Sequence, residues 1–107
     1  MGAACRGGAC GRVAILNDAL VGYTSAAAEV STWLARDHLH MDCLFVSPTC
    51  RGRGIGTALI SALATYARTN RYSEIQWQTP DWNLDAARYY RNLGALAQSK
   101  IRFRMQT

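Results

Sequence analysis

The sequence lacks the ligand spacing of a metal site. Its cysteines form no CxxC pair, and they are Cys5, Cys10, Cys43 and Cys50. His38 and His40 have no third ligand near them, whereas structural zinc sites use four ligands at short, regular spacing. We therefore expect no bound metal, and we expect the thiols to stay reduced in the cytoplasm.

Long hydrophobic runs are also scarce. The opening stretch MGAACRGGACGR contains no apolar segment long enough for a signal peptide or a membrane span. No internal repeat and no linker divides the 107 residues. We expect a flexible leader over residues 1–11 and a single domain over residues 12–107, in a cytoplasmic protein without a membrane partner.

Acidic residues are few, because 7 Asp and Glu stand against 12 Lys and Arg, for a formal net charge of +5. This balance favours anionic partners, such as nucleic acid, a phosphorylated cofactor or a membrane surface, without choosing among them. The basic residues are spread along the chain and match no nucleic-acid-binding motif. A nucleic-acid-binding protein is therefore the least favoured reading, and we expect no nucleic acid partner.

Hydrophobic periodicity predicts the order strand, strand, strand, helix, strand, helix, strand. Alternating or β-rich runs predict strands over residues 12–16, 19–25, 39–46, 74–79 and 101–105. A helical period predicts helices over residues 57–70 and 84–93, with Asn70 and Gly94 as their stops. Asn17 and Asp18 suit a hairpin turn, and the stretch of residues 26–37 fits either a loop that leads into a strand or a short helix.

This order of elements predicts an α/β (α+β) fold. A strand, a crossover helix and the next strand form a parallel pair, which would lie at the centre of an otherwise antiparallel sheet. The helices would pack on that mixed sheet.

The stretch CRGRGIGTAL, residues 50–59, alternates arginine and glycine directly before a helix. Gly52, Gly54 and Gly56 free the backbone to curl, and the first amides of the helix would point into the loop. Such a loop suits a phosphate or pyrophosphate, with Arg51 and Arg53 at its rim. It ends in no Gly-Lys-Ser/Thr and is not the dinucleotide fingerprint. The alternative is a tight turn with solvated arginines.

A second group of residues lies in DWNLDAARYYRNLGA, residues 81–95. Asn83 precedes the predicted helix, and Ala86 and Tyr90 lie one turn apart on one side of it. A small residue there would let a ligand lie against the helix, and the tyrosine hydroxyl would reach the far end of that ligand. Tyr90 taken alone also fits an ordinary core tyrosine.

These two groups, together with LFVSP before the loop, resemble the GCN5-related N-acetyltransferase (GNAT) superfamily. The resemblance runs from about Arg12 to the C-terminus. Within the superfamily, the chain is most similar to the diamine branch, which acetylates spermidine, spermine or thialysine. The features that carry this similarity are STW, the acidic residue before LFV, and WN. The resemblance to the superfamily implies an acyl-CoA N-acyltransferase fold, here without the usual N-terminal strand and helices.

The resemblance also implies roles for individual residues. Asp42 would receive the proton of the amine, although it also fits a surface carboxylate at a strand edge, and Tyr90 would protonate the departing thiolate. Asn83 and Ala86 would line one side of acetyl-CoA. The pantetheine arm would pair with a strand of Leu44, Phe45 and Val46, one of whose amides would polarise the thioester. The pyrophosphate would lie on a loop of Arg51, Gly52, Arg53, Gly54, Ile55, Gly56 and Thr57.

The resemblance therefore implies an enzyme that transfers acetyl from acetyl-CoA to a primary amine of a small molecule by direct attack. A non-catalytic acyl-CoA-binding or sensing module is the first alternative, and a nucleic-acid-binding protein is the second. Because the lack of the N-terminal elements that the family usually has would leave the sheet exposed, we expect a homodimer.

Overall fold

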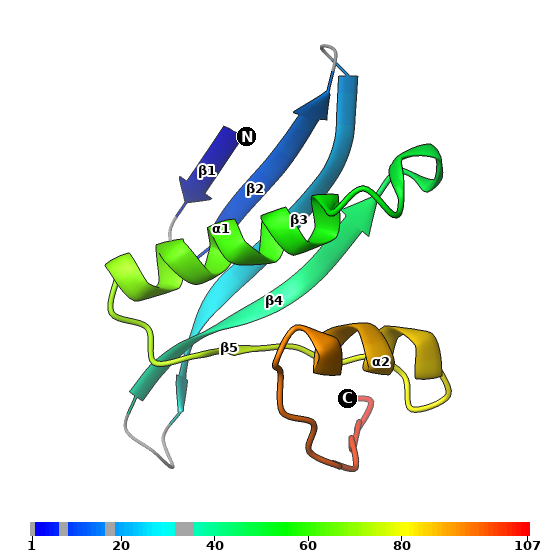
Figure 1. Cartoon of the computed structure of the whole chain (residues 1–107). Helices are drawn as coiled ribbons and strands as arrows, with labels where there is room; N and C mark the ends of the chain where they lie inside the picture. The colour runs from blue at the N-terminus through cyan, green and yellow to red at the C-terminus, as the bar shows by residue number, and fades with distance from the viewer. Residues whose placement is uncertain (1, 7–8, 17–18, 32–35) are drawn as a thin grey trace. The chain divides into compact units, whose positions relative to one another are not determined.

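The structure is a computed structural model that describes residues 2–6, 9–16, 19–31 and 36–107. The chain divides into two compact units, Met1–Trp77 and Gln78–Thr107, and each is described by itself. The first unit is a five-stranded sheet with one α-helix across one of its faces (Figure 1). Its elements are β1 (Gly2–Arg6), β2 (Ala9–Leu16), β3 (Ala19–Ser31), β4 (Arg36–Val46), a 3-10 turn η1 (Pro48–Cys50), α1 (Ile55–Thr69) and β5 (Ile75–Gln76).

The sheet is mixed, as the sequence predicts. Strands β1 to β4 pair antiparallel in chain order, and β5 pairs parallel to β4. The parallel pair lies at the end of the strand order, not at its centre, because residues 101–105 carry no strand that could extend the sheet beyond β5. The stretch of residues 26–37 continues β3 as far as Ser31 and opens β4 at Arg36.

The structure differs from the expected flexible leader over residues 1–11. Gly2–Arg6 forms β1 and pairs with β2, whose first residue is Ala9. The antiparallel ladder uses backbone groups, so a run of glycine and alanine can join it despite its weak strand preference. That residues 12–107 form one domain stays a prediction, and the turn expected at Asn17 and Asp18 lies outside the described residues.

Helix α1 packs its predicted apolar face on the sheet. Leu59, Leu63 and Ala67 recur every four residues and are buried. Leu63 and Ala67 pack with residues of β3 and β4, namely Ala26, Leu39 and Met41. The helix begins two residues before its expected start, and Asn70 caps its C-terminal end, which confirms that residue as the stop.

Strand β4 contains a bulge at Asp42. Ser25 of β3 is opposite Cys43 and Ala26 is opposite Met41, so Asp42 is an extra residue without an opposite partner. The bulge changes which residues face α1. Leu39 and Met41 pack in the core before it, and Leu44 and Val46 pack against the core after it.

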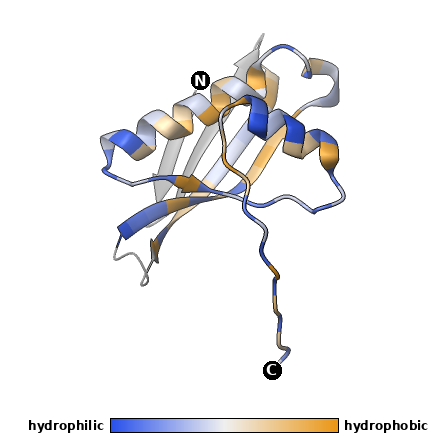
Figure 2. Cartoon of the chain, turned by 60° about the horizontal axis from the view of Figure 1, so that its bottom comes forward, coloured by the Kyte–Doolittle hydropathy of each residue, from blue (hydrophilic) through white to orange (hydrophobic). Residues whose placement is uncertain are grey.

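The second unit contains α2 (Leu84–Asn92), which confirms the predicted helix. Gly94 has a positive φ of 95° and ends it, as expected. The strand expected at residues 101–105 is wrong, because the segment is extended without strand pairing (Figure 2). Its apolar side chains, those of Ile101, Phe103 and Met105, are 80–89 % exposed. Alternation alone does not form a strand, which also needs a partner for its backbone groups.

In the described parts of the chain, no helix has both the length and the hydropathy needed to cross a membrane.

Candidate functional site

The glycine-rich loop between η1 and α1 depends on two left-handed backbone positions. Gly52 and Gly54 have φ values of 78° and 76°, a region that side chains other than glycine rarely adopt. A Cβ at either residue would meet no atom within 4 Å, so the backbone conformation, not crowding, requires glycine. Gly56 differs from these two because it already lies in the first turn of α1.

The start of α1 faces this loop with backbone donors. Gly54 is the N-cap residue, and its carbonyl accepts the first helical hydrogen bond from the Ala58 amide at 3.0 Å. The amides of Ile55 and Gly56 precede that bond and have no partner within the helix. Arg51 and Arg53 are exposed, and the first turn carries no acidic residue. The loop therefore has the donors and the positive potential to hold an anion.

Gly22 of β3 holds α1 close to the sheet, and sequence analysis missed it. A Cβ there would lie 2.8 Å from the Phe45 carbonyl oxygen, 3.2 Å from Leu59 Cδ1 and 3.3 Å from Ile55 Cγ2. The absence of a side chain thus lets the first turns of α1 approach β3 and the end of β4. A lone glycine within an apolar strand pattern was the available signal.

Beyond the bulge, one edge of β4 is not paired with β5. In the register of these two strands, only Leu39 and His40 of β4 have β5 partners. On the other edge, the Ser47 amide donates to the Val21 carbonyl at 2.7 Å, and the Phe45 carbonyl lies toward Gly22. These contacts are all made with β3.

Backbone direction alternates along a strand, so the two residues on either side of Phe45 turn the other way. The amides and carbonyls of Leu44 and Val46 therefore face the open edge, whereas those of Phe45 face β3. This divides the predicted strand residues Leu44, Phe45 and Val46 into two that can pair with an extended ligand and one that cannot. Arg51 joins the loop to this edge, because its Nε donates to the Val46 carbonyl at 3.3 Å.

Asp42 lies at the bulge on the sheet face opposite α1. Its side chain is 59 % exposed, and its Oδ1 lies 4.0 Å from Nε2 of His40. A bulge re-aims a side chain relative to the regular strand, and such residues are common beside active sites. Asp42 is therefore placed as an accessible carboxylate next to the open edge of β4.

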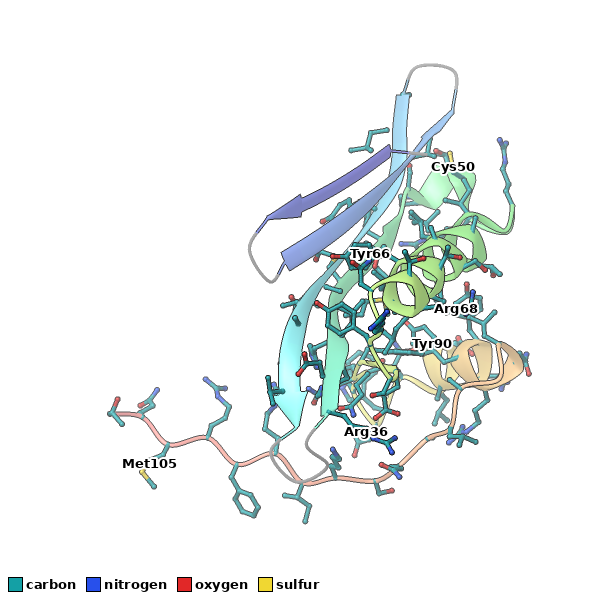
Figure 3. The ribbon with its side chains drawn as sticks, turned by 90° about the vertical axis from the view of Figure 1, so that its left-hand side faces the viewer. Arg36, Cys50, Tyr66, Arg68, Tyr90 and Met105 are labelled. Carbon is teal, nitrogen blue, oxygen red and sulfur yellow. The ribbon has the colours of Figure 1, made fainter. Side chains whose placement is uncertain are left out.

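Helix α2 carries the remaining predicted residues. The Asn83 side chain is the N-cap and accepts a hydrogen bond from the Ala86 amide at 3.2 Å, so this pair has a structural role in the helix itself. Tyr90 projects from α2 (Figure 3) and its ring centroid lies 5.4 Å from that of Tyr89. Burial, and then the neighbouring Tyr89, raise the pKa of Tyr90 above the ordinary value for a phenol.

The predicted site residues fall in both units. The first unit brings together Asp42, the open edge of β4 and the loop before α1, and Cys50 lies buried where the loop begins (Figure 3). The second unit holds Asn83, Ala86 and Tyr90 on one short helix. Among the described residues no group of three or more His, Cys, Asp or Glu could hold a metal ion.

The acetyltransferase (GNAT) family model matches residues 3–95. Thialysine N-epsilon-acetyltransferase of Mus musculus is 36 % identical over 76 residues, which cover 71 % of this chain and 44 % of the relative. L-ornithine N5-acetyltransferase of Arabidopsis thaliana is 28 % identical over 81 residues, covering 75 % and 36 %. The chain thus spans less than half the length of these curated relatives.

Solved structures share the fold. An integron cassette protein of V. cholerae is 29 % identical with a TM-score of 0.83, covering 94 % of this chain and 62 % of its own. An aminoglycoside N-acetyltransferase in complex with CoA has a TM-score of 0.85 at 18 % identity, covering 95 % and 78 %. At that identity the second likeness concerns the fold alone.

Proposed function

The chain belongs to the acetyltransferase (GNAT) family, and on this premise we propose that it transfers the acetyl group of acetyl-CoA to a primary amine of a small molecule. The observation that carries the proposal is the adjacency of two features in the first unit. The loop at Gly52 and Gly54 can hold an anion, and it is joined directly to the open edge of β4 through Arg51 and Val46. A pyrophosphate followed by an extended amide-containing arm needs these two features side by side.

The residues of the first unit suit acetyl-CoA in this way. Backbone amides at the start of α1 would bind the pyrophosphate, with Arg51 and Arg53 beside it. Leu44 and Val46 would pair with the pantetheine arm as an added strand. The Leu44 amide, which faces the open edge closest to Asp42, would donate to the thioester oxygen as negative charge develops there.

The chemistry then needs a base and an acid. When bound, acetyl-CoA supplies an activated acetyl thioester. Asp42 would take a proton from the ammonium group, and the neutral nitrogen would form the new bond to the acetyl carbon as the carbon–sulfur bond breaks. Tyr90, whose pKa is raised by burial, would give its hydroxyl proton to the sulfur, and the second proton that the acylated nitrogen loses would restore the Tyr90 hydroxyl. The products are an acetylated amine and free CoA.

The names of the relatives support an amine acceptor of low molecular weight. Thialysine and ornithine acetyltransferases both act, by name, on a primary amine of a small amino acid. We propose an acceptor of that chemical class for this chain, and we place the chain in the diamine branch. Asn83 and Ala86 would lie along the cofactor, in addition to their capping role.

A CoA-release assay tests the proposal. Wild-type protein is incubated with acetyl-CoA and separate diamines, amino acids, amino sugars and peptide N-termini, and free thiol is measured. Tyr90→Phe should lose most of the release, while Tyr89→Phe, which removes the neighbouring hydroxyl on α2, should keep it. Full activity in Tyr90→Phe would overturn its role as the acid. Acetyl-CoA binding without release for any amine would favour the non-catalytic module.

We also propose a homodimer. On the sheet face that does not carry α1, Tyr23 of β3 and Phe45 of β4 pack together with ring centroids 5.5 Å apart, and they are 39 % and 41 % exposed. Burial of this apolar surface against a second copy would stabilise a small domain. Sedimentation at micromolar concentration should show the dimer, and a stable monomer would contradict it.

The proposed location is the cytoplasm. Cys43 and Cys50 are free thiols, which agrees with a reducing compartment. Fractionation of cells that produce the protein should recover it with cytoplasmic markers, and recovery with membranes would contradict this. The absence of a nucleic acid partner stays a prediction, which salt-sensitive DNA binding would overturn.

A further inference from the structure

A histidine lies next to the proposed base on the same sheet face. His40 Nε2 is 4.0 Å from Asp42 Oδ1, and the two side chains are 21 % and 59 % exposed. Asp42 is thus open to solvent and to an incoming amine, whereas His40 is more sheltered behind it. The proposed function assigns no role to His40.

The backbone explains why these side chains meet. Asp42 is the extra residue of the bulge, so it is displaced from the regular spacing of the strand. His40 is opposite Ala27 on β3 and Gln76 on β5. Ala27 is too small to fill the space beside the imidazole, and Gln76 is uncharged. Neither neighbour holds the imidazole in an ion pair.

The other ionisable groups near this pair are already engaged. Glu29 of β3 lies 3.2 Å from His38. Glu74, which precedes β5, accepts a hydrogen bond from Gln76 at 2.8 Å. Tyr23 and Cys43 share a side-chain hydrogen bond with each other. Among the described residues, the ion-pair contact recorded for His40 is the one with Asp42.

We propose that His40 is a positioning residue that receives from Asp42 the proton taken from the acceptor amine. This inference rests on the proposed function, in which Asp42 is the base. Asp42 carboxylate takes one proton from the ammonium group, and the resulting carboxylic acid passes it to Nε2 of neutral His40 through one bridging water, because 4.0 Å is too long for a direct hydrogen bond. Asp42 returns to the carboxylate form, and the imidazolium releases its proton to solvent.

The proton affinities of the two groups make this relay useful. An imidazole ordinarily titrates about two pH units above a carboxylic acid, much closer to neutral pH. A proton acceptor works best when its pKa lies near the working pH.

The test compares His40→Gln with His38→Gln. Both variants remove an imidazole from β4, but His38 is paired with Glu29 and lies away from the bulge. With the best amine of the panel, kcat/KM for the amine should fall about tenfold or more in His40→Gln, with the KM for acetyl-CoA unchanged. The dependence of the rate on pH should also differ from that of wild type in His40→Gln, because the variant lacks one proton-accepting group. His38→Gln should keep the wild-type pH profile.

Chemical rescue separates proton transfer from structural damage. His40→Ala should regain activity when imidazole is added to the assay, and His38→Ala should not respond. Thermal melts of each variant check that it is folded. If His40→Gln or His40→Ala fails to fold, His40→Asn replaces it, and a folded His40→Asn variant that keeps the wild-type rate contradicts the relay.

The outcomes distinguish this inference from the proposed function. A wild-type protein that releases no CoA with any amine overturns both. An active wild-type protein whose His40→Gln variant keeps its rate and pH profile overturns the relay alone and leaves Asp42 as the base. A loss in His40→Gln together with imidazole rescue of His40→Ala supports both.

Discussion

Gly22 and Phe45 approach so closely that a Cβ on Gly22 would lie 2.8 Å from the Phe45 carbonyl oxygen. The contact is made across β3 and β4, where α1 also reaches the sheet through Leu59 and Ile55. Real Cβ atoms essentially never lie that close to a backbone oxygen, and the oxygen belongs to the ladder itself. The position of the loop before α1 therefore depends on glycine at this residue.

The first prediction follows from this contact. Gly22→Ala should lower the free energy of unfolding by about 1–3 kcal/mol, because the backbone of β4 or the start of α1 must move to admit a methyl group. Urea unfolding measures the change. Ser25→Ala, on the same strand, is the control and should have little effect. Equal stability of Gly22→Ala and wild type would contradict this, because it would mean that β3 and β4 can move apart at this point at little cost in free energy.

The second prediction concerns the positive-φ glycines of the loop. Gly52→Ala should weaken acetyl-CoA binding and lower stability by roughly 1–2 kcal/mol, because alanine disfavours the left-handed conformation. Calorimetric titration with acetyl-CoA and thermal melts give the two quantities. The loop itself has room for the added methyl group, so any effect reports backbone conformation.

Gly94→Ala is the matched control for this variant. Gly94 also has a positive φ, 95°, and open space around its Cβ position, but it lies after α2. It should lose similar stability while acetyl-CoA binding stays unchanged. Equal weakening of binding in both variants would mean that general destabilisation, not the loop, is responsible.

The third prediction separates the two roles proposed for Asn83. Asn83→Ala removes the side-chain acceptor of the Ala86 amide and should cost about 1 kcal/mol of stability. Asn83→Ser keeps a capping oxygen and should recover most of that loss. Chemical denaturation measures both. If Asn83→Ser recovers stability but binds acetyl-CoA more weakly than wild type, Asn83 also contacts the cofactor. If its acetyl-CoA affinity equals that of wild type, the capping hydrogen bond is the whole role of Asn83.

Local features were predictable from the sequence, and contacts between distant segments were not. The apolar face and the end of α1 follow from its apolar period and from Asn70, all within one segment, whereas its start was expected two residues too late. The role of Gly22 depends on how closely α1 packs on β3, which no local pattern specifies. The open edge at Leu44 and Val46 likewise follows from strand register and from the shortness of β5.

The bulge is an intermediate case. The apolar residues of β4 alternate up to Met41 and resume at Leu44, so the interruption at Asp42 is visible in the sequence once the strand is known. Its consequence, the contact between Asp42 and His40, required the three-dimensional register. The expected strand at residues 101–105 failed for the opposite reason, since its alternation was clear but its backbone has no strand partner in the described chain.

The last prediction uses the titration of Tyr90. Burial raises its pKa in the folded protein, so the unfolded chain gives up this proton first as the pH rises above about 10. The contribution of Tyr90 to stability is complete below that pH and is lost as the pH rises through the folded-state value. The free energy of unfolding should therefore decline above pH 10, and less steeply in Tyr90→Phe.

Tyr23 must be separated from this effect, because its hydrogen bond with Cys43 also raises its pKa. Urea unfolding is therefore measured between pH 8 and pH 11 for wild type, Tyr23→Phe, Tyr90→Phe and the double variant. Each single change should remove part of the alkaline decline, and the double change should remove more than either. If Tyr90→Phe declines as steeply as wild type, Tyr90 is not shielded from water in the folded protein, which contradicts the burial that raises its pKa.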